Sequence, residues 1–541
     1  MMDDSRARGG LLLEIRGLKI EARTSEGAWN EIVHGVDLDL HRGEILGLIG
    51  ESGAGKSTIG LAAMGFAREG CRIAGGSIRF DGTDLATASE AVKRHLRGAR
   101  IAYVAQSAAA AFNPAHRLID QYAEGPIRHG VKSKAEAYAD AKALYARMQL
   151  PTPNEIGFRY PHQVSGGQLQ RAMTAMAMAC RPDLIIFDEP TTALDVTTQI
   201  EVLASIKDIV RQFQTAAIYI THDLAVVAQM ADRIKVLQYG REVEEAPAAT
   251  MMASPREEYT RSLWAVRHME KPLAPPPALD PVLSVRHVTA AYGQGVTVLD
   301  DVSVDLHRGR TVAVVGESGS GKSTLARVIA GLLPPGQGHV LIDGGPLSPT
   351  LAGRTREDRQ RIQMIYQMAD TALNPRQKIR DIIGRPMQFY LGLDRAAVTA
   401  KVGEMLEMIE LPKAFADRYP GELSGGQKQR IGIARALAAE PEVVICDEVT
   451  SALDQLVAEG ILKLLMRLQA EMKLSYLFIT HELATVKAIA DDVVVMRHGK
   501  VVDSGTKADV LFPPRKDYTR TLLNSVPEMD TRWLDRLLAA R

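Results

Sequence analysis

The sequence predicts an α/β fold built as two tandem copies of one domain. Each copy contains a glycine-rich loop, GESGAGKST from Gly50 to Thr58 and GESGSGKST from Gly316 to Thr324, between a strand-like apolar run and an apolar helical pattern. The sequence blocks that follow each loop recur in the same order about 260 residues later. Strand and helix patterns alternate in both copies, which favours a mainly parallel sheet covered by helices. Because the repeat occurs only twice, a solenoid of three or more stacked units is a poor alternative.

The length and one proline-rich segment divide the chain. With 541 residues in total, each half can bury a large core of its own. The stretch KPLAPPPALDP, Lys271 to Pro281, favours an extended, semi-rigid connector over a packed element. We therefore expect a first domain over residues 1–265, a linker over residues 266–281 and a second domain over residues 282–541.

Composition narrows the function classes. The 65 basic and 65 acidic residues cancel, so the chain has no overall electrostatic footprint for nucleic acid or an anionic membrane, and only a local basic patch stays open. Its three cysteines lack metal-binding or disulfide spacing, which is typical of a reducing compartment. The apolar stretch near the N-terminus is too short for a signal peptide, and nowhere do 18 apolar residues follow one another. We therefore expect a chain that does not itself span a membrane.

The expected elements follow the same order in each half. An alternating strand pattern opens the half, a short apolar strand precedes the glycine-rich loop, and a charged helical stretch follows further on. After an Asp-Glu pair come a helix, another apolar strand and two short strands. These segments are 11–22, 44–49, 132–150, 216–222 and 233–243 in the first half, and 282–293, 311–315, 395–411, 474–481 and 492–502 in the second. The charged stretches are expected to form a helical subdomain beside the α/β core.

Both glycine-rich loops fit the phosphate-binding pattern Gly-x4-Gly-Lys-Ser. Glycines let backbone N–H groups wrap phosphates, Lys56 and Lys322 reach the β and γ oxygens, and Ser57 and Ser323 offer hydroxyls to Mg²⁺. The alternative is a glycine turn that opens a helix and binds nothing. That alternative is reasonable for a single copy but poor for two copies in the same sequence context. The candidate ATP-binding residues are Gly50, Ser52, Gly53, Gly55, Lys56, Ser57 and Thr58 in the first loop and Gly316, Ser318, Gly319, Gly321, Lys322, Ser323 and Thr324 in the second.

The repeated sequence Ser-Gly-Gly-Gln is a second candidate phosphate contact. Each copy precedes a helical pattern, where free N–H groups and the positive end of the helix attract phosphate. Glycine also permits a close backbone approach. A simple helix N-cap explains either copy alone, but explains the full set of repeated motifs less well. The residues are Ser165, Gly166, Gly167 and Gln168 in the first half and Ser424, Gly425, Gly426 and Gln427 in the second.

An Asp-Glu pair ends an apolar strand in each half. The carboxylates of Asp188 and Asp447 can help to hold Mg²⁺, although a strand-end cap is the plainer alternative. Glu189 and Glu448 are the candidate general bases or water-orienting groups. Since neither half lacks its glutamate, we expect both sites to hydrolyse ATP.

Taken together, these motifs resemble those of ATP-binding-cassette ATPases with two fused nucleotide-binding domains. Phosphate loop, Gln loop, signature, Asp-Glu strand, Asp loop and His switch occur in that order twice. The resemblance implies two P-loop NTPase cassettes, each with a RecA-like core, an antiparallel β subdomain and a helical signature subdomain. It also implies that each ATP lies between the phosphate loop of one half and the signature of the other, so that one chain supplies both halves of the sandwich. His222 and His481 match the family residue at the γ-phosphate.

Further motifs narrow the resemblance to importers of dipeptides, oligopeptides and nickel. Gln106 and Gln367 match the glutamine that senses Mg²⁺ and faces the membrane subunit, and the segments SAAAAFNP and MADTALNP follow them. The tails SPREEYTRSL and PPRKDYTRTLL resemble the C-terminal extension of that subfamily. Many relatives carry a cysteine cluster for an iron–sulfur centre near this extension. Because this chain lacks those cysteines, no cluster is expected.

The resemblance therefore implies a peripheral ATPase at the cytoplasmic face of the inner membrane, using ATP and Mg²⁺ to drive a peptide-type importer. Its expected partners are two transmembrane permease subunits and, indirectly, an extracytoplasmic substrate-binding protein, and no nucleic acid. The cargo stays open among peptides, nickel chelates, glutathione, opines and oligosaccharides. A soluble twin-cassette ATPase acting on ribosomes or nucleic acid is the alternative, but such proteins usually have a long charged linker between the cassettes. A binding module without catalysis conflicts with the intact Glu and His pairs.

One departure from the family pattern concerns adenine. Tyr292 matches the family's adenine-stacking aromatic residue in the second half, whereas the equivalent position of the first half is Ala22. We therefore expect weaker ATP binding at the first site. Trp29 is a possible substitute, although an apolar residue in the strand connection is the more favoured interpretation of Trp29.

Overall fold

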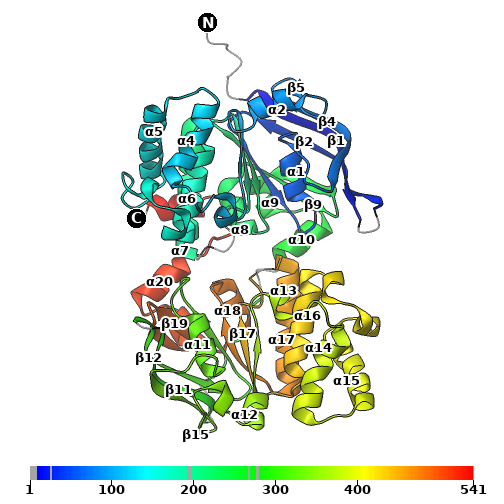
Figure 1. Ribbon diagram of the computed structural model, residues 1–541, viewed down its shortest axis with the longest axis vertical. Helices are drawn as coiled ribbons and strands as arrows, with labels where there is room; N and C mark the ends of the chain where they lie inside the picture. The colour runs from blue at the N-terminus through cyan, green and yellow to red at the C-terminus, as the bar shows by residue number, and fades with distance from the viewer. Residues whose placement is uncertain are drawn as a thin grey trace. The chain divides into compact units, whose positions relative to one another are not determined.

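The computed structural model describes residues 9–24, 27–191, 194, 196–265, 269–275, 280–293, 295–451 and 453–539. The chain forms two compact units (Figure 1). The first comprises Met1–Trp264 together with Pro527–Arg541, and the second comprises Ala265–Val526. Each unit contains one four-stranded and one six-stranded sheet among its described residues, so the α/β class and the tandem arrangement are confirmed.

The larger sheet of the first unit has the order β10-β9-β3-β8-β7-β6. Its strands are β3 (Ile45–Ile49), β6 (Ile101–Val104), β7 (Leu184–Asp188), β8 (Ala216–Ile220), β9 (Arg233–Gln238) and β10 (Arg241–Pro247). All neighbours pair in parallel except β10, which runs antiparallel to β9. Strands β3, β7 and β8 are buried at every residue, which explains their continuous apolar sequences.

The smaller sheet of the first unit is antiparallel, with the order β2-β1-β4-β5. Its strands are β1 (Leu11–Arg23), β2 (Trp29–His41), β4 (Cys71–Phe80) and β5 (Thr83–Asp84). Apolar residues of β1 and β2, including Leu13, Ile15 and Leu38, join one core cluster with Leu46 and Leu48 of β3. The alternating sequence of these strands therefore places one face of the small sheet on the core that supports the glycine-rich loop.

Helices pack against the large sheet, and others form the expected helical subdomain. They are α1 (Lys56–Ala62), α2 (Glu90–Leu96), α3 (Ala108–Ala111), α4 (Leu118–Arg128), α5 (Lys134–Arg147), α6 (Gly166–Ala177), α7 (Val196–Phe213), α8 (Leu224–Met230), α9 (Ala248–Ala253), α10 (Glu258–Ala265) and, from the end of the chain, α21 (Trp533–Ala539), with short 3₁₀ turns η2 (Ile156–Phe158) and η3 (Pro161–Gln163). The charged stretch 132–150 contains α5, which begins at a capping box formed by Ser133 and Glu136. Helices α4, α5 and α6 pack against one another. The Ser-Gly-Gly-Gln sequence lies at the start of α6.

The second unit repeats this architecture. Its small sheet contains β11 (Pro281–Tyr292), β12 (Val296–His307), β14 (Gln337–Ile342) and β15 (Gly345–Pro346). Its large sheet contains β13 (Thr311–Val315), β16 (Ile362–Ile365), β17 (Val443–Asp447), β18 (Ser475–Ile479), β19 (Asp492–Arg497) and β20 (Lys500–Thr506), in the order β16-β17-β18-β13-β19-β20. The helices are α11 (Lys322–Ile329), α12 (Arg356–Arg361), α13 (Ala369–Ala372), α14 (Ile379–Pro386), α15 (Arg395–Met408), α16 (Gly425–Leu437), α17 (Gln455–Met472), α18 (Leu483–Ile489), α19 (Lys507–Leu511) and α20 (Asp517–Asn524), with short turns η5 (Leu351–Gly353), η6 (Met387–Leu391), η7 (Lys413–Asp417) and η8 (Pro420–Glu422).

The structure differs from the expected domain boundaries at two places. Residues 269–275, expected in a linker, belong to the second unit because Lys271 and the carbonyl of Pro275 bond to its core residues. Residues 527–541, expected in the second domain, group with the first unit. The proline content of the expected linker predicts an extended chain, but it does not predict which polar groups the segment bonds to. Residues 266–268 and 276–279 of the expected linker lie outside the described residues.

No helix within the described ranges is both long and apolar enough to cross a membrane.

Candidate nucleotide-binding sites

Each glycine-rich loop joins the buried strand at the centre of the large sheet to a helix. In the first unit it runs from the end of β3 to Gly55, the left-handed N-cap residue of α1. Gly50, Gly53 and Gly55 all have positive φ angles of 145°, 85° and 90°. A Cβ atom on Gly50 would lie 2.1 Å from the carbonyl oxygen of Leu237, whereas one on Gly53 would meet nothing within 4 Å. The loop thus needs glycine for its own backbone and leaves open space beside Gly53, where a phosphate can approach.

The second loop has the same construction. Gly316, Gly319 and Gly321 have φ angles of 154°, 80° and 101°. A Cβ on Gly316 would lie 2.1 Å from the carbonyl oxygen of Met496, and one on Gly319 would meet nothing within 4 Å. The two loops are therefore equivalent in backbone as well as in sequence.

A lysine, a serine and an aspartate meet at each loop. Lys56 Nζ donates to the carbonyl oxygens of Gly50 and Glu51 at 2.7 and 2.8 Å, and Ser57 Oγ donates to Asp188 Oδ1 at 2.8 Å. In the second unit Lys322 Nζ donates to Gly316 and Glu317, and Ser323 Oγ donates to Asp447 Oδ1 at 3.0 Å. Mg²⁺ is commonly bound by one or two protein oxygens plus substrate phosphates. A hydroxyl and a carboxylate oxygen side by side fit that ion.

Next to each aspartate, one glutamate bonds to a glutamine and a histidine. Gln106 Nε2 donates to Glu189 Oε2 at 3.0 Å, and His222 Nδ1 lies 3.2 Å from Glu189 Oε1. The corresponding distances from Glu448 are 2.6 Å to Gln367 Nε2 and 3.4 Å to His481 Nδ1. Three residues far apart in sequence thus converge in each unit. Glu189 and Glu448 also adopt left-handed φ angles of 48° and 49°, a strained conformation for glutamate.

Burial and these contacts shift the ionisation of the site. Burial alone would lower the pKa of His222 and of His481, but the hydrogen bond to the adjacent glutamate and the charges of nearby carboxylates together outweigh it and raise both. Burial would raise the pKa of Glu448, but the bond to His481 and the charge of that ring lower it. The glutamate is therefore held as a carboxylate, the form that accepts a proton from water.

The Ser-Gly-Gly-Gln residues form a capping box at the start of a helix in each unit. Ser165 Oγ accepts from the Gln168 N–H at 3.4 Å, and Gln168 Oε1 accepts from the Ser165 N–H at 3.1 Å. Ser424 and Gln427 make the same pair of bonds before α16.

The two glycines of this sequence differ in their surroundings. A Cβ on Gly167 would lie 2.2 Å from Thr198 Cγ2, and one on Gly426 would lie 2.4 Å from Val457 Cγ1. The second glycine is thus required for helix packing. By contrast, a Cβ on Gly166 meets nothing within 4 Å, and one on Gly425 only Leu453 Cδ2 at 4.0 Å. Only the first glycine leaves room for a ligand.

The aspartates of the two units have different surroundings, which the sequence analysis missed. Asp188 Oδ2 accepts a 2.5 Å hydrogen bond from Tyr103 in β6. Parallel pairing places Met364 of β16 at the position of Tyr103, and Met364 offers no hydroxyl. Burial raises the pKa of Asp447, which the bond from Ser323 only partly offsets. The sequence signal for this contact was Tyr103 itself, in the strand sequence that precedes Gln106.

Comparison with known proteins identifies the family. The model for the ABC transporter family matches residues 33–192 and 299–451, which together make up more than half of the chain. The chain belongs to the ABC transporter family. A second model, the oligopeptide/dipeptide transporter C-terminal region, matches residues 502–540. The two units of this chain are therefore ABC cassettes, and the chain is an ABC-type ATPase.

The chain also aligns with curated relatives over nearly its whole length. It is 38% identical over 562 aligned positions to the glutathione import ATP-binding protein GsiA of Salmonella choleraesuis (strain SC-B67), covering 96% of this chain and 90% of the relative. Identity to the protein of the same name from Escherichia coli (strain K12) is 37%, covering 92% and 86%. Among solved structures, cbiO1 from Clostridium perfringens, part of the ABC transporter complex cbiONQ, matches with 29% identity and a TM-score of 0.40, covering 43% of this chain and 92% of that one.

The strand position expected to stack on adenine carries different residues in the two cassettes. Leu13 pairs with Leu40 as Leu283 pairs with Leu306, and the same count along β1 and β11 brings Ala22 to the position of Tyr292. Tyr292 is 42% exposed, and its hydroxyl lies 3.4 Å from Thr324 Oγ1 of the phosphate loop. An exposed ring beside the loop is available for stacking.

Trp29 lies differently. It pairs with Arg23, one position beyond the Ala22–Asn30 pair, so Trp29 and Ala22 point to opposite faces of the sheet. The guanidinium of Arg72 covers the Trp29 ring at 4.3 Å. The structure thus places Trp29 at the first position of β2, partly exposed and on the face of the sheet opposite to Ala22, rather than in the strand connection.

The C-terminal extension of each cassette reaches its phosphate loop, a contact that the sequence analysis also missed. The hydroxyl of Tyr259, from SPREEYTRSL, accepts from the N–H of Glu51 at 3.2 Å. Tyr518, from PPRKDYTRTLL, accepts from the N–H of Glu317 at 3.4 Å. The repeated Tyr-Thr motif was visible in sequence, but its target was not. It fixes the backbone at the start of each phosphate loop.

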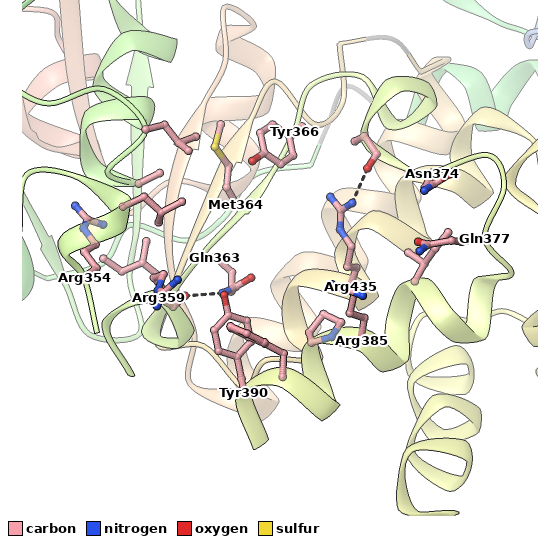
Figure 2. Close-up of a pocket in the computed structure, with 18 residues that line it drawn as sticks. Arg354, Arg359, Gln363, Met364, Tyr366, Asn374, Gln377, Arg385, Tyr390 and Arg435 are labelled. Atoms are coloured by element: carbon pink, nitrogen blue, oxygen red, sulfur yellow. Dashed lines mark hydrogen bonds between the residues drawn. The ribbon is translucent and has the colours of Figure 1, made fainter. Parts of the chain in front are cut away.

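A pocket lies behind the Gln loop of the second cassette (Figure 2). Its volume is about 590 Å³, and β16, α14, η6 and the end of α16 contribute to its walls. Tyr366 and Phe389 are 43% and 49% exposed. Arg354 is almost fully buried, and its Nη2 has no hydrogen-bond partner among the residues that the structure describes. The pocket thus offers aromatic surface to a partner.

Proposed function

We propose that this chain is the ATP-hydrolysing subunit of an importer of peptide-type solutes. The observation that carries the proposal is the convergence, in both cassettes, of glutamine, glutamate and histidine beside a phosphate loop. The oligopeptide/dipeptide transporter region and the glutathione-import relatives support the importer class. Glutathione and short peptides are the proposed cargo class.

The proposed chemistry follows from the site residues. Backbone N–H groups of each loop and Lys56 or Lys322 bind the β- and γ-phosphates. Glu189 and Glu448 orient a water and accept its proton, while His222 and His481 hold the carboxylate and face the γ-phosphate. Ser57 with Asp188, and Ser323 with Asp447, would hold Mg²⁺, with Gln106 and Gln367 nearby. Bound there, the ion neutralises charge that develops on the phosphates.

We further propose that one chain provides both halves of the ATP sandwich. Ser165 with Gly166 and Ser424 with Gly425 would supply the signature contacts, because open space beside the first glycine of each pair admits a phosphate. Nucleotide binding would favour one state of the attached permeases and hydrolysis the other. A peripheral place at the cytoplasmic face of the inner membrane follows from this role.

The pocket behind Gln367 is the proposed docking place for one permease. The exposed aromatic rings of Tyr366 and Phe389 suit an amphipathic segment of that permease. Since the pocket adjoins the Gln loop, a partner bound there can sense the state of Glu448.

Affinity purification of the tagged chain from gently solubilised membranes tests this function. We expect two hydrophobic permeases to co-purify, and uptake of glutathione or short peptides to require Glu189 and Glu448. Phe389→Ala should reduce permease recovery without changing ATP affinity, whereas the matched control Tyr239→Ala, an exposed aromatic residue of the first cassette, should not. Recovery of ribosomal RNA instead of permeases would favour the soluble twin-cassette alternative.

A further inference from the structure

The chain passes between the two units at two equivalent points. The eight-residue helices α10 and α20 end the two cassettes. The second unit begins at Ala265, the last residue of α10, and the residues from Pro527, beyond α20, belong to the first unit. Each cassette therefore sends the end of its own extension into the unit formed by the other.

A buried glutamine holds the last segment of the chain in the first unit. Gln229 of α8 is 2% exposed. Its Nε2 donates to the carbonyl oxygens of Glu528 and Asp530, both at 2.8 Å, and its Oε1 accepts from the N–H of Leu534 at 3.0 Å. One side chain thus satisfies three backbone groups of the tail, which fixes both its path and its register.

A charge pair and apolar contacts complete this docking. Lys207 of α7 has a side chain only 7% exposed, and its Nζ lies 2.9 Å from Asp535 Oδ1. Trp533 and Leu534 are 6% and 0% exposed, and α21 packs on α7. The red C-terminal end of the chain accordingly lies within the first unit in Figure 1. Without Asp535, Lys207 would lose the carboxylate that compensates its buried charge.

In the second unit, the segment 269–275 is held by different groups. Lys271 Nζ lies 2.7 Å from Asp491 Oδ2 and donates to Gln469 Oε1 at 3.2 Å. Arg310 Nη1 donates to the carbonyl oxygen of Pro275 at 2.9 Å. Met269 packs against the core cluster of the helical side of this cassette. Asp491 is itself 5% exposed, so the segment closes a buried polar site.

The two docking grooves are not interchangeable. Helices α7 and α17 have eighteen residues each, and Lys207 in α7 corresponds to Met466 in α17. Likewise Gln229 in α8 corresponds to Ala488 in α18. Asp232 of the first unit corresponds to Asp491 of the second, because each accepts a hydrogen bond from the N–H of the first residue of the central strand. Asp491 pairs with Lys271, whereas Asp232 borders a cavity of about 740 Å³. Each groove therefore fits the segment that it holds.

We propose that the two cassettes are clasped by reciprocal exchange of their C-terminal extensions within one chain. Residues 269–275 fasten the end of the first cassette to the second unit, and residues 527–539 fasten the end of the second cassette to the first. This clasp holds the units together without nucleotide, so that the opening which follows hydrolysis does not separate them. Because Tyr259 and Tyr518 bond to the phosphate loops, each arm of the clasp also starts at a nucleotide site.

The test places a specific protease site at residues 276–279 of the full-length chain. After cleavage, each fragment still carries one exchanged segment, so we expect the fragments to remain one complex without nucleotide in size-exclusion chromatography and native mass spectrometry. The triple variant Lys207→Ala, Gln229→Ala, Lys271→Ala should weaken fragment association at least about tenfold, because buried partners are lost in both grooves. Lys463→Ala removes an exposed lysine that pairs within its own helix α17 and serves as the matched control.

The other outcomes overturn the proposal. Separation of the parent fragments on cleavage, or unchanged association of the triple variant, would show that the exchanged segments do not hold the units. A complex of twice the expected mass would show exchange between chains. Hydrogen exchange on the uncut Gln229→Ala variant gives a second readout: α21 should exchange at least about tenfold faster than in the parent. Unchanged exchange there would equally contradict the clasp.

Discussion

The two cassettes share the residues that we propose for hydrolysis but differ in what surrounds them. Both place a glutamate between a glutamine and a histidine, and both hold a serine against an aspartate. Around this shared set, the first cassette has Tyr103 on its aspartate and no aromatic residue at Ala22. The second cassette has Met364 and Tyr292 at those positions.

This difference separates two requirements of the site. Hydrolysis needs the glutamate in a fixed place, and each cassette fixes it with the same two partners. We propose that adenine stacks on an exposed ring at this strand position, where the first cassette has Ala22 and the second has Tyr292. We therefore expect the two sites to share a mechanism and to differ in nucleotide affinity.

The largest expected effect comes from removing the shared glutamates. Glu189→Gln combined with Glu448→Gln should lower steady-state ATP hydrolysis about 100- to 10,000-fold, because a positioned base contributes that much. Each single variant should lose only the turnover of its own site. Near-normal hydrolysis by the double variant would remove both residues from the catalytic role.

The phosphate-loop lysines should have the next largest effect. Lys56→Ala or Lys322→Ala deletes a charged donor aimed at the phosphates, worth about 1.5 to 3 kcal/mol, or roughly 10- to 150-fold in ATP affinity at that site. Binding of a fluorescent ATP analogue, measured in variants that retain one intact loop, checks this. Equal losses at both sites would show that the difference between the cassettes lies outside the loops.

The adenine position tests the difference between the cassettes directly. Tyr292→Ala should weaken the second site by about 1 to 3 kcal/mol, and Ala22→Tyr should strengthen the first. Trp29→Ala should change neither affinity, because Arg72 covers its ring on the far face of the sheet. Equal affinity of the two sites in the parent, together with no response to Ala22→Tyr, would contradict the proposed asymmetry.

The smallest expected effect concerns stability against acid. In the second cassette Arg308 and Arg361 pair with Asp343 and Glu442. Burial would raise the pKa of each carboxyl group, but the two arginines lower both. Carboxylates with a lowered pKa stabilise the fold above their ordinary pKa, and this contribution is lost as pH falls through the folded value.

Arg361→Gln should therefore cost about 1 kcal/mol or less at pH 7, since these groups are partly exposed. The cost should shrink as pH falls below about 4. Arg100→Gln is the matched variant, because Arg100 pairs with Asp81 and Asp183 in the first cassette. Urea unfolding at several pH values measures both, and a cost independent of pH would exclude the charge pairs as its cause.

Sequence patterns predicted the architecture because each motif encodes a local backbone requirement. The apolar strands before both loops and the capping boxes before α6 and α16 are visible in a few adjacent residues. The contacts that sequence reasoning missed all join distant segments: Tyr103 to Asp188, Tyr259 to Glu51, and Gln229 to the tail. Side chains of these types occur throughout the chain, and only the fold selects which of them meet.

The domain boundaries show the same limit. The proline-rich stretch indicated where one domain ends, but a lysine within it gave no sign of its buried partner Asp491. Likewise, the residues after α20 continue the second cassette in sequence and join the first in space.

Counting the ATP retained by the double variant Glu189→Gln, Glu448→Gln tests the central claim most directly. With hydrolysis blocked and both phosphate loops intact, the purified monomeric chain should retain two ATP molecules. Retention of a single ATP per chain, at saturating nucleotide, would contradict the claim that both cassettes contain a complete site.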